Sequence, residues 1–132
     1  MTRFAIDAVT ALRILDDERD LAATHSLVGP ALLRSDALAS LYGDVRAGRL
    51  DEKAGRAKLE SLAALKIRLL GDRVSRATAW KVAAQLGWDD TRPAEYLAVA
   101  MLQADVLVAG DPALATAAEG LVPVAAYDEL FG

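Results

Sequence analysis

Residues 96–114, YLAVAMLQADVLVAGDPAL, decide the fold class of this chain. The stretch begins on a helix expected over about residues 92–104, continues into the apolar run VLVAG at 106–110, and stops at Asp111, which Pro112 follows. A short apolar run bounded by turn residues is typical of a buried strand. An aspartate before a proline is typical of a helix start. The stretch therefore predicts a helix, a strand and a second helix in succession.

The same alternation extends along the rest of the chain. Short apolar runs predict strands, and capped or amphipathic segments predict helices. The further strands are expected at residues 3–6, 26–30, 66–71 and 122–126, and the further helices at 8–15, 30–47 (with Pro30 in its first turn), 51–65, 72–86 and 112–120. Strands that alternate with helices imply a parallel sheet covered on both faces. We therefore expect residues 1–132 to form one α/β domain, with three α/β/α layers and a central parallel sheet of about five strands.

The composition limits the classes of protein to which the chain can belong. The 132 residues include no cysteine, which excludes disulfides, thiol nucleophiles and cysteine-bound zinc. No stretch reaches the roughly 18 uninterrupted apolar residues of a membrane helix, and no signal peptide is evident, so we expect a cytoplasmic protein without a membrane segment. The 54% hydrophobic fraction is mostly Ala, Leu and Val and favours self-association. The net charge of −4 argues against capture of nucleic acid by the whole surface.

Three aspartates stand where the predicted elements can bring them together. Asp7 and Asp111 each follow a predicted strand, and Asp36 lies at the edge of the apolar face of its helix. Sites in open α/β sheets gather beyond the carboxyl ends of the strands, and clustered carboxylates suit Mg²⁺ or Mn²⁺. Helix capping is the alternative for Asp7 and Asp111, and spacing alone favours it. Capping explains Asp36 less well, because it is expected in the middle of a helix.

Four segments together resemble the PIN-domain family, in the small VapC-like form common in actinobacteria. They are RFAIDAVTALRIL (3–15), LVGPALLRSDALASLY (27–42), KIRLLGDRVSRATAWKVAAQLGWDDT (66–91) and AEYLAVAMLQADVLVAGDPALATAAEGLVPVA (94–125). The resemblance covers nearly the whole chain and keeps the order of the segments. It implies a parallel sheet between helices and a metal-dependent ribonuclease, often a toxin that a cognate antitoxin protein neutralises. It also implies an RNA substrate and a homodimer.

The resemblance implies a set of site residues as well. The acidic cluster of the family falls on Asp7, Asp36 and Asp111, which would be catalytic and would hold Mg²⁺ or Mn²⁺, although glutamate is commoner at the second position. Pro93 stands where this subgroup usually has an aspartate, and Ala109 where it usually has a threonine. These departures leave two functions open. One is an RNA-cleaving enzyme, and the other is a catalytically degenerate domain that binds RNA or a protein.

Neighbouring residues offer replacements for the missing acid. Asp90 lies just upstream of Pro93 and is a candidate substitute, with capping and turn formation as the favoured alternative for this residue. Arg34 and Arg92 flank the proposed acids. They are candidates for contacts with phosphate or for ion pairs with the carboxylates.

Other features weigh less in the functional interpretation. Residues 66–81 carry five basic residues and one acid, which form either a local track for RNA phosphates or a solvated helix face; the pattern favours the latter. Trp80 and Trp88 can stack on bases, but their apolar neighbours favour core packing. His25, the one histidine, belongs to no hydrolase motif. The acidic run at 16–18 is expected to be a solvated connection.

Overall fold

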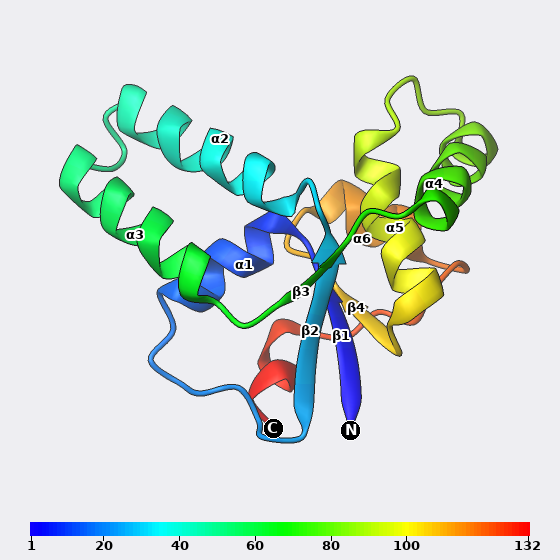
Figure 1. The fold of residues 1–132 in the computed structure, drawn as a ribbon, viewed down its shortest axis with the longest axis horizontal. Helices are drawn as coiled ribbons and strands as arrows, with labels where there is room; N and C mark the ends of the chain where they lie inside the picture. The colour runs from blue at the N-terminus through cyan, green and yellow to red at the C-terminus, as the bar shows by residue number, and fades with distance from the viewer.

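Four parallel strands form the sheet at the centre of the computed structural model, which describes residues 1–132 (Figure 1). The strands are β1 (Thr2–Ile6), β2 (His25–Pro30), β3 (Arg68–Leu70) and β4 (Val106–Val108). Their spatial order is β3-β2-β1-β4, so β1 and β2 occupy the middle of the sheet. Because every pair is parallel, the carboxyl ends of all four strands lie at the same edge.

Helices connect the strands and cover the sheet. They are α1 (Ala8–Leu15), α2 (Leu33–Arg46), α3 (Glu52–Ala64), α4 (Arg73–Leu86), α5 (Arg92–Gln103) and α6 (Pro112–Ala118), and a 3-10 turn, η1 (Tyr127–Phe131), follows them. α5 packs against β1 and β2 with α4 on its outer side, whereas α1 lies across the sheet from α5 and contacts α2 and α3 (Figure 1). This arrangement confirms the expected α/β class with a parallel sheet between helices. None of the helices is long and apolar enough to cross a membrane.

The core lies between the sheet and the helices on its two sides. Phe4, Ala5 and Ile6 of β1 are buried in succession, as expected for a central strand that is covered on both faces. α5 is buried continuously over residues 96–100 because it lies between the sheet and α4. A helix that is apolar nearly all round needs such a position.

Aspartates begin helices where the sequence predicts caps. Asp51 accepts a hydrogen bond from Ala54 N at 2.7 Å, and Asp72 accepts one from Ser75 N at 2.8 Å. Each bond satisfies one of the free N–H groups in the first turn of a helix. Gly87 ends α4 with a φ of 71°, a conformation that glycine adopts without strain.

The fifth strand expected at 122–126 does not form. Leu107 N donates to Pro123 O and Ala125 N donates to Leu107 O, each at 2.9 Å, which makes a single parallel bridge between Leu107 and Val124. Pro123 has no N–H with which to extend a ladder, and the chain turns into η1 directly afterwards. The sheet therefore has four strands rather than five.

The start of the second helix also differs from the prediction. Pro30 is the last residue of β2 and pairs with Leu70, and α2 begins only at Leu33. Ala31 N donates to Leu70 O at 2.8 Å, so the pairing with β3 includes the residue after the proline, and a turn at residues 31–32 then leads into the helix. As a result Asp36 lies in the first turn of α2 and not in its middle. The positive end of the helix dipole favours a carboxylate there.

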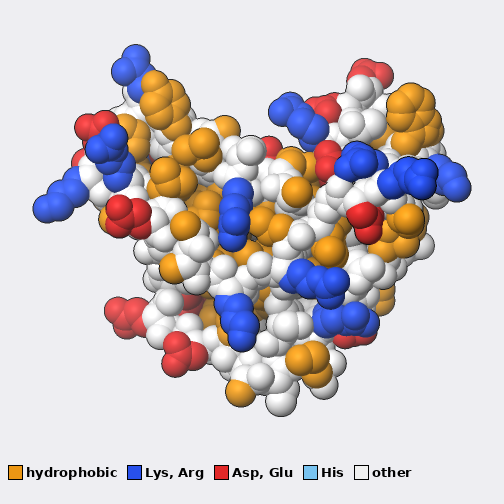
Figure 2. All heavy atoms as spheres, viewed as in Figure 1, with side chains coloured by type: hydrophobic (Ala, Val, Ile, Leu, Met, Phe, Trp, Pro, Cys, Tyr) orange, Lys and Arg blue, Asp and Glu red, His pale blue; other side chains and the backbone are white.

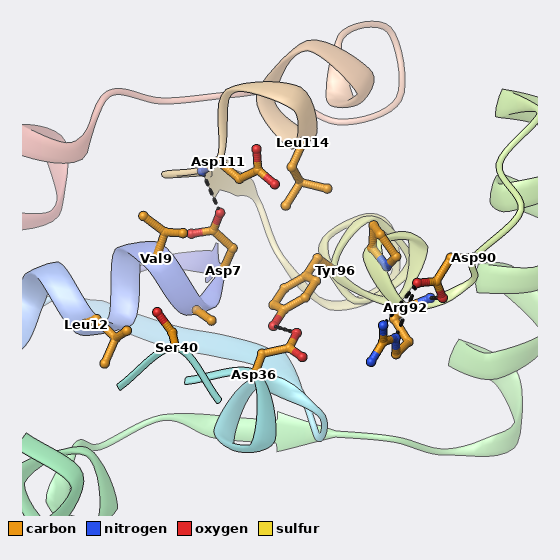
Figure 3. Close-up of a pocket in the computed structure, with 12 residues that line it drawn as sticks. Asp7, Val9, Leu12, Asp36, Ser40, Asp90, Arg92, Tyr96, Asp111 and Leu114 are labelled. Atoms are coloured by element: carbon orange, nitrogen blue, oxygen red, sulfur yellow. Dashed lines mark hydrogen bonds and ion pairs between the residues drawn. The ribbon is translucent and has the colours of Figure 1, made fainter. Parts of the chain in front are cut away.

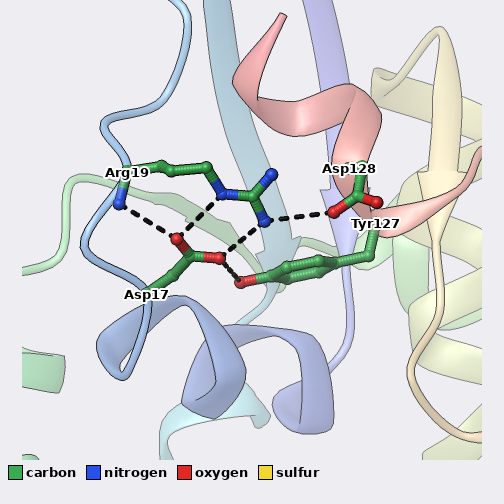
Figure 4. A network of polar contacts seen from close by, with 4 residues as sticks. All are labelled: Asp17, Arg19, Tyr127 and Asp128. Carbon is green, nitrogen blue, oxygen red and sulfur yellow. Dashed lines mark hydrogen bonds and ion pairs between the residues drawn. The ribbon is translucent and has the colours of Figure 1, made fainter.

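A polar network fastens the C-terminal segment to the connection after α1 (Figure 4). Arg19 Nε and Nη2 donate to the two oxygens of Asp17 at 3.0 and 2.9 Å, and Nη2 also donates to Asp128 at 3.0 Å. The Tyr127 hydroxyl donates to Asp17 Oδ2 at 3.0 Å. The side chain of Asp17 is only 15% exposed, so the expectation that residues 16–18 are all solvated is wrong at this position.

Candidate functional site

Asp7 and Asp111 lie beside each other because the strands that precede them are neighbours. Asp7 follows β1 directly, Asp111 comes three residues after the end of β4, and Ile6 pairs with Val108. The Thr10 hydroxyl donates to Val108 O at 3.1 Å and fastens the start of α1 to the end of β4. The two aspartates therefore stand together at the carboxyl edge of the sheet.

The Asp7 carboxylate is a buried acceptor of three backbone hydrogen bonds. Its Oδ1 accepts from Thr10 N at 2.9 Å and from Gly110 N at 3.0 Å, and its Oδ2 accepts from Asp111 N at 2.9 Å. Asp7 is 3% exposed. It caps α1, as the capping interpretation predicts, and it also ties α1 to the turn after β4. Its oxygens are largely used within the protein.

Gly110 makes this close approach of the turn to α1 sterically feasible. A Cβ at this position would lie 2.5 Å from Val9 Cγ1 and 3.2 Å from Thr10 N. A larger residue would push the turn away from α1 and lengthen the hydrogen bond from Gly110 N to Asp7.

Asp36 and Asp111 are more open than Asp7, and each keeps one oxygen without a hydrogen bond from the protein. Asp111 caps α6, with its Oδ1 accepting from Ala113 N at 3.0 Å. Asp36 Oδ2 accepts from the Tyr96 hydroxyl at 2.6 Å. Asp111 is exposed and Asp36 is half-buried. The Oδ2 of Asp111 and the Oδ1 of Asp36 are therefore available to a ligand.

Tyr96 holds Asp36 from the facing helix, α5. Tyr96 is 6% exposed. Burial, reinforced by the hydrogen bond to Asp36, raises the pKa of the Tyr96 hydroxyl well above its ordinary value of 10.0. The hydroxyl therefore stays protonated around neutral pH and remains a donor to Asp36.

A hollow of about 320 Å³ opens beyond the carboxyl ends of the strands, and four aspartates line it (Figure 3). They come from four separate segments of the chain: Asp7 before α1, Asp36 in α2, Asp90 in the connection from α4 to α5, and Asp111 before α6. The remaining lining residues are Ala8, Val9, Leu12, Ser40, Arg92, Pro93, Tyr96 and Leu114. The hollow thus concentrates negative charge and has a single arginine in its lining.

Of the other candidate residues predicted from sequence, Asp90 and Arg92 line the hollow and Arg34 does not. Asp90 and Arg92 both line the hollow, and Asp90 accepts from the Arg92 backbone N at 3.0 Å and from its guanidinium at 3.3 Å. The backbone hydrogen bond from Arg92 is the main reason that the pKa of Asp90 is lowered. Arg34 is exposed in the first turn of α2 and does not line the hollow. Ala109 packs against the core.

Glu95 lies in the first turn of α5 and is half-buried. Burial raises the pKa of Glu95, the charge of Asp36 raises it further, and the charge of Arg76 on α4 opposes the increase. Glu95 is not among the residues that line the hollow. Its carboxyl group therefore senses both an acid of the hollow and a cation of α4.

The aspartates do not form a cage of three acids around a metal position. No group of three or more His, Cys, Asp or Glu side chains lies close enough together to hold a metal ion. Pro93, where the family resemblance implies an acid, lines the hollow and has no side-chain oxygen or nitrogen that could bind a metal. Mg²⁺ is commonly bound by one or two carboxylates and several waters. The free oxygens of Asp36 and Asp111 fit that mode of binding in their chemistry.

Sequence reasoning did not identify Tyr96 and Ser40 as residues of the site. Ser40 lines the hollow one helical turn after Asp36 on α2, and a spacing of four residues signals a shared face. A tyrosine in an otherwise apolar helix needs a partner for its hydroxyl. This need for a partner is the sequence feature that indicates a polar contact of Tyr96.

Comparison with known proteins supports the fold and goes no further. The chain matches no protein-family model and no curated protein. Among solved structures it is similar to the crystal structure of PAE2754 from Pyrobaculum aerophilum, with a TM-score of 0.69 and 22% sequence identity over 92% of this chain and 89% of that chain. At this identity the likeness shows a shared fold over nearly the whole length. A shared fold does not determine function, which depends on the residues of the site.

Proposed function

We propose that this chain is a PIN-like domain of the VapC type that hydrolyses RNA phosphodiester bonds with Mg²⁺ or Mn²⁺ in the hollow lined by the four aspartates. The order of the segments that resemble the family supports this proposal. The position of the hollow at the carboxyl edge of a parallel sheet supports it too, because that edge is where such sheets place their sites. A cytoplasmic location and a role in a toxin–antitoxin pair belong to the same proposal.

The observation that carries the proposal is the charge of the hollow. Four carboxylates and one guanidinium surround about 320 Å³. This excess of negative charge would repel the phosphates of RNA. A divalent cation would neutralise it. When bound, Mg²⁺ or Mn²⁺ supplies activation of a water molecule and neutralisation of charge on the phosphodiester.

The residues around the hollow have separate tasks in this proposal. Asp36 and Asp111 would hold the ion through their free oxygens. Tyr96 keeps Asp36 in one orientation through the 2.6 Å hydrogen bond. Asp7 fixes the backbone N–H of Asp111 at 2.9 Å and so positions the Asp111 side chain. Arg92, exposed beside the hollow, is placed to contact a phosphate.

A second function, the binding of RNA or a protein without catalysis, is favoured by two observations. Pro93 removes one acid from the set that the family resemblance implies. The Asp7 carboxylate accepts three backbone hydrogen bonds, which leaves it little capacity to bind a metal. In this second function the remaining aspartates stabilise helix starts and turns.

Calorimetric titration of Mn²⁺ distinguishes the two functions. The proteins to compare are the wild type, Asp36→Asn and Asp111→Asn. Asparagine keeps an oxygen for the Tyr96 hydroxyl and for the cap of α6, so each variant loses charge and keeps its fold. We expect specific binding by the wild type and at least about tenfold weaker binding by each variant, which corresponds to about 1.4 kcal/mol. Cleavage of RNA in the presence of Mn²⁺ should weaken in parallel.

Asp20→Asn is the matched control for this titration. Asp20 is exposed in the connection after α1 and does not line the hollow, so its substitution should leave Mn²⁺ binding unchanged. The absence of binding heat from the wild type, together with intact RNA after incubation, would reject the enzyme and favour the second function.

The proposal also includes two protein partners, a second copy of this chain and an antitoxin. Leu38, Tyr42 and Leu59 are exposed apolar residues around a second hollow of about 500 Å³ between α2 and α3. Exposed apolar surface of this kind suits a protein interface. We expect a homodimer in light scattering at micromolar concentration, and a monomer throughout that range would contradict it.

A further inference from the structure

α4 presents an exposed tryptophan on the same face as two arginines that precede it. Trp80 is 72% exposed, whereas Trp88 is partly buried and packs against the core. The prediction of core packing is therefore confirmed for Trp88 and wrong for Trp80. Arg73, Arg76 and Trp80 are spaced by three and four residues, so they share one face of the helix along about 10 Å of its axis. We call these three residues the α4 stripe.

The cations of the α4 stripe have no acidic partner. Neither Arg73 nor Arg76 takes part in an ion pair, and the Arg76 guanidinium donates only to a backbone carbonyl, that of Gly71, at 2.6 Å. Asp72 is the one acid in the segment, and its carboxylate is engaged in capping α4. The positive charge of the stripe is therefore left for a ligand.

Further unpaired cations adjoin the stripe. Lys66 and Arg68 are exposed at and just before β3, the edge strand, and Lys81 is exposed next to Trp80. Lysine and arginine side chains lie across the face of the molecule over β3 and the start of α4 (Figure 2). This local positive surface exists although the whole chain has a net charge of −4.

The α4 stripe is connected to the hollow through α5. α4 packs on α5, whose first turn lines the hollow with Arg92 and Pro93. A ligand that lies along the stripe is therefore separated from the hollow by a single helix, α5.

We infer that the α4 stripe anchors a single strand of RNA outside the hollow, with one base stacked on the Trp80 indole and the neighbouring phosphates against Arg73 and Arg76. This inference rests on the proposed function in taking RNA as the ligand, and it does not require cleavage. Base stacking on an aromatic side chain needs an unpaired base, which selects single strands over duplexes. The unpaired arginines match a polyanion. A second copy of this chain docking stripe to stripe would bring like charges together.

Fluorescence anisotropy with a labelled single-stranded RNA of about 12 nucleotides, in EDTA, tests the inference. EDTA removes divalent metal, so binding is measured apart from hydrolysis. We expect Trp80→Ala to weaken binding about tenfold, in line with the loss of one stacked base. We expect the double variant Arg73→Ala/Arg76→Ala to reduce the slope of log affinity against log salt by about 1.4, since each phosphate contact on a single strand contributes about 0.7.

Lys53→Ala serves as the matched control, because it removes an exposed cation from α3, away from both the α4 stripe and the two hollows. This change should leave the affinity for RNA unaltered. In a Trp88→Phe variant, Trp80 is the only remaining indole, and its fluorescence should be quenched on addition of the RNA.

Two outcomes would overturn the inference while leaving the proposed function to its own test. One is unchanged affinity in Trp80→Ala alongside cleavage of RNA by the wild type with Mn²⁺. The other is a change in light scattering for Trp80→Ala with RNA affinity intact, which would assign the stripe to a protein interface. Conversely, binding that depends on Trp80 without any cleavage would uphold the anchor and reject the enzyme.

Discussion

The two ends of α1 both gather aspartates, yet the partners of those aspartates differ. At the N-terminal end Asp7 receives hydrogen bonds only from backbone N–H groups. Beside it, Asp36 and Asp111 each keep a free oxygen toward the hollow (Figure 3). None of these three carboxylates forms an ion pair with a lysine or arginine.

At the C-terminal end of α1 the aspartates are matched by cations. Asp17 receives both arms of the Arg19 guanidinium as well as the Tyr127 hydroxyl (Figure 4). Asp16 pairs with Lys58 on α3 at 2.8 Å. These bonds join the end of α1 to η1 and to α3.

The contrast separates structural acids from candidate functional ones. A carboxylate that already has a cation offers little to a ligand, and its role is to join segments. A set of carboxylates without cations keeps an unbalanced charge, which a ligand of opposite sign can neutralise. Asp7 lies between these cases, since it has no cation but is saturated with backbone donors.

The largest effect on stability should come from Asp7→Ala. The change removes the cap of α1 and leaves the N–H groups of Gly110 and Asp111 without their acceptor. We expect a loss of about 3 kcal/mol of unfolding free energy, because a cap and two hydrogen bonds to a buried charge disappear together. Thermal unfolding should show a fall in Tm of about 10 °C.

Asp51→Ala is the matched control for this measurement. Asp51 caps α3 through one hydrogen bond and makes no bond to another strand. Its loss should cost about 1 kcal/mol. Equal costs for the two variants would show that the bonds from Asp7 to the turn after β4 contribute nothing, and the account of the N-terminal end would be wrong.

An acid added at position 93 should increase the unbalanced charge at the N-terminal end of α1. Pro93→Asp adds a fifth carboxylate to the lining of the hollow in the first turn of α5, where the helix dipole tolerates it. We expect Mn²⁺ to bind at least about tenfold more tightly in calorimetry, a gain of about 1.4 kcal/mol. Pro93→Asn, which lacks the charge, should show no gain. Equal affinities for the two variants would remove Pro93 from any part in metal binding.

The two tyrosines that donate to aspartates provide a third test of the contrast. Tyr96→Phe deletes the hydrogen bond to Asp36 and should cost about 1 kcal/mol, because Tyr96 is buried and Asp36 has no other donor. Tyr127→Phe should cost less, since Arg19 still holds Asp17. Burial, reinforced by the hydrogen bond to Asp17, raises the pKa of Tyr127 to about 12, so both hydroxyls are donors at neutral pH. Chemical denaturation of both variants measures the difference, and a larger loss from Tyr127→Phe would reverse the argument.

The sequence predicted the alternation of elements well because apolar runs and caps are local signals. The caps at Asp51 and Asp72 and the end of α4 at Gly87 all follow from neighbouring residues. The apolar pattern at 122–126 predicts a strand, but Pro123 within it lacks the N–H that a ladder needs, and only one bridge forms. Strand pairing is a property of two segments, and one segment does not reveal it.

The sequence indicated which aspartates lie at the candidate site, but it did not indicate how their side chains are held. Asp7, Asp36, Asp90 and Asp111 line one hollow, and strand order explains why Asp7 and Asp111 are neighbours. The partner of Asp36 comes from α5, sixty positions along the chain, so no local pattern indicates it. The exposure of Trp80 likewise depends on how α4 packs against α5. Such tertiary contacts decide whether an aspartate is a cap, a ligand or both.

The smallest effect on stability should come from the C-terminal end of α1, where the aspartates are paired with cations. Hydrogen bonds from Arg19 hold the pKa of Asp17 well below its ordinary value of 3.8. A carboxylate whose pKa is lowered by folding stabilises the protein above its unfolded pKa and loses that contribution as the pH falls through its folded pKa. We therefore expect Asp17→Asn to have a slightly lower Tm than the wild type at pH 7, with a difference that shrinks below about pH 3.8 and with added salt. Asp20→Asn, which removes an unpaired aspartate from the same connection, should show no such dependence. A difference for Asp17→Asn that grows in acid would mean that the network does not hold the charged form, and the distinction between the two ends of α1 would fail.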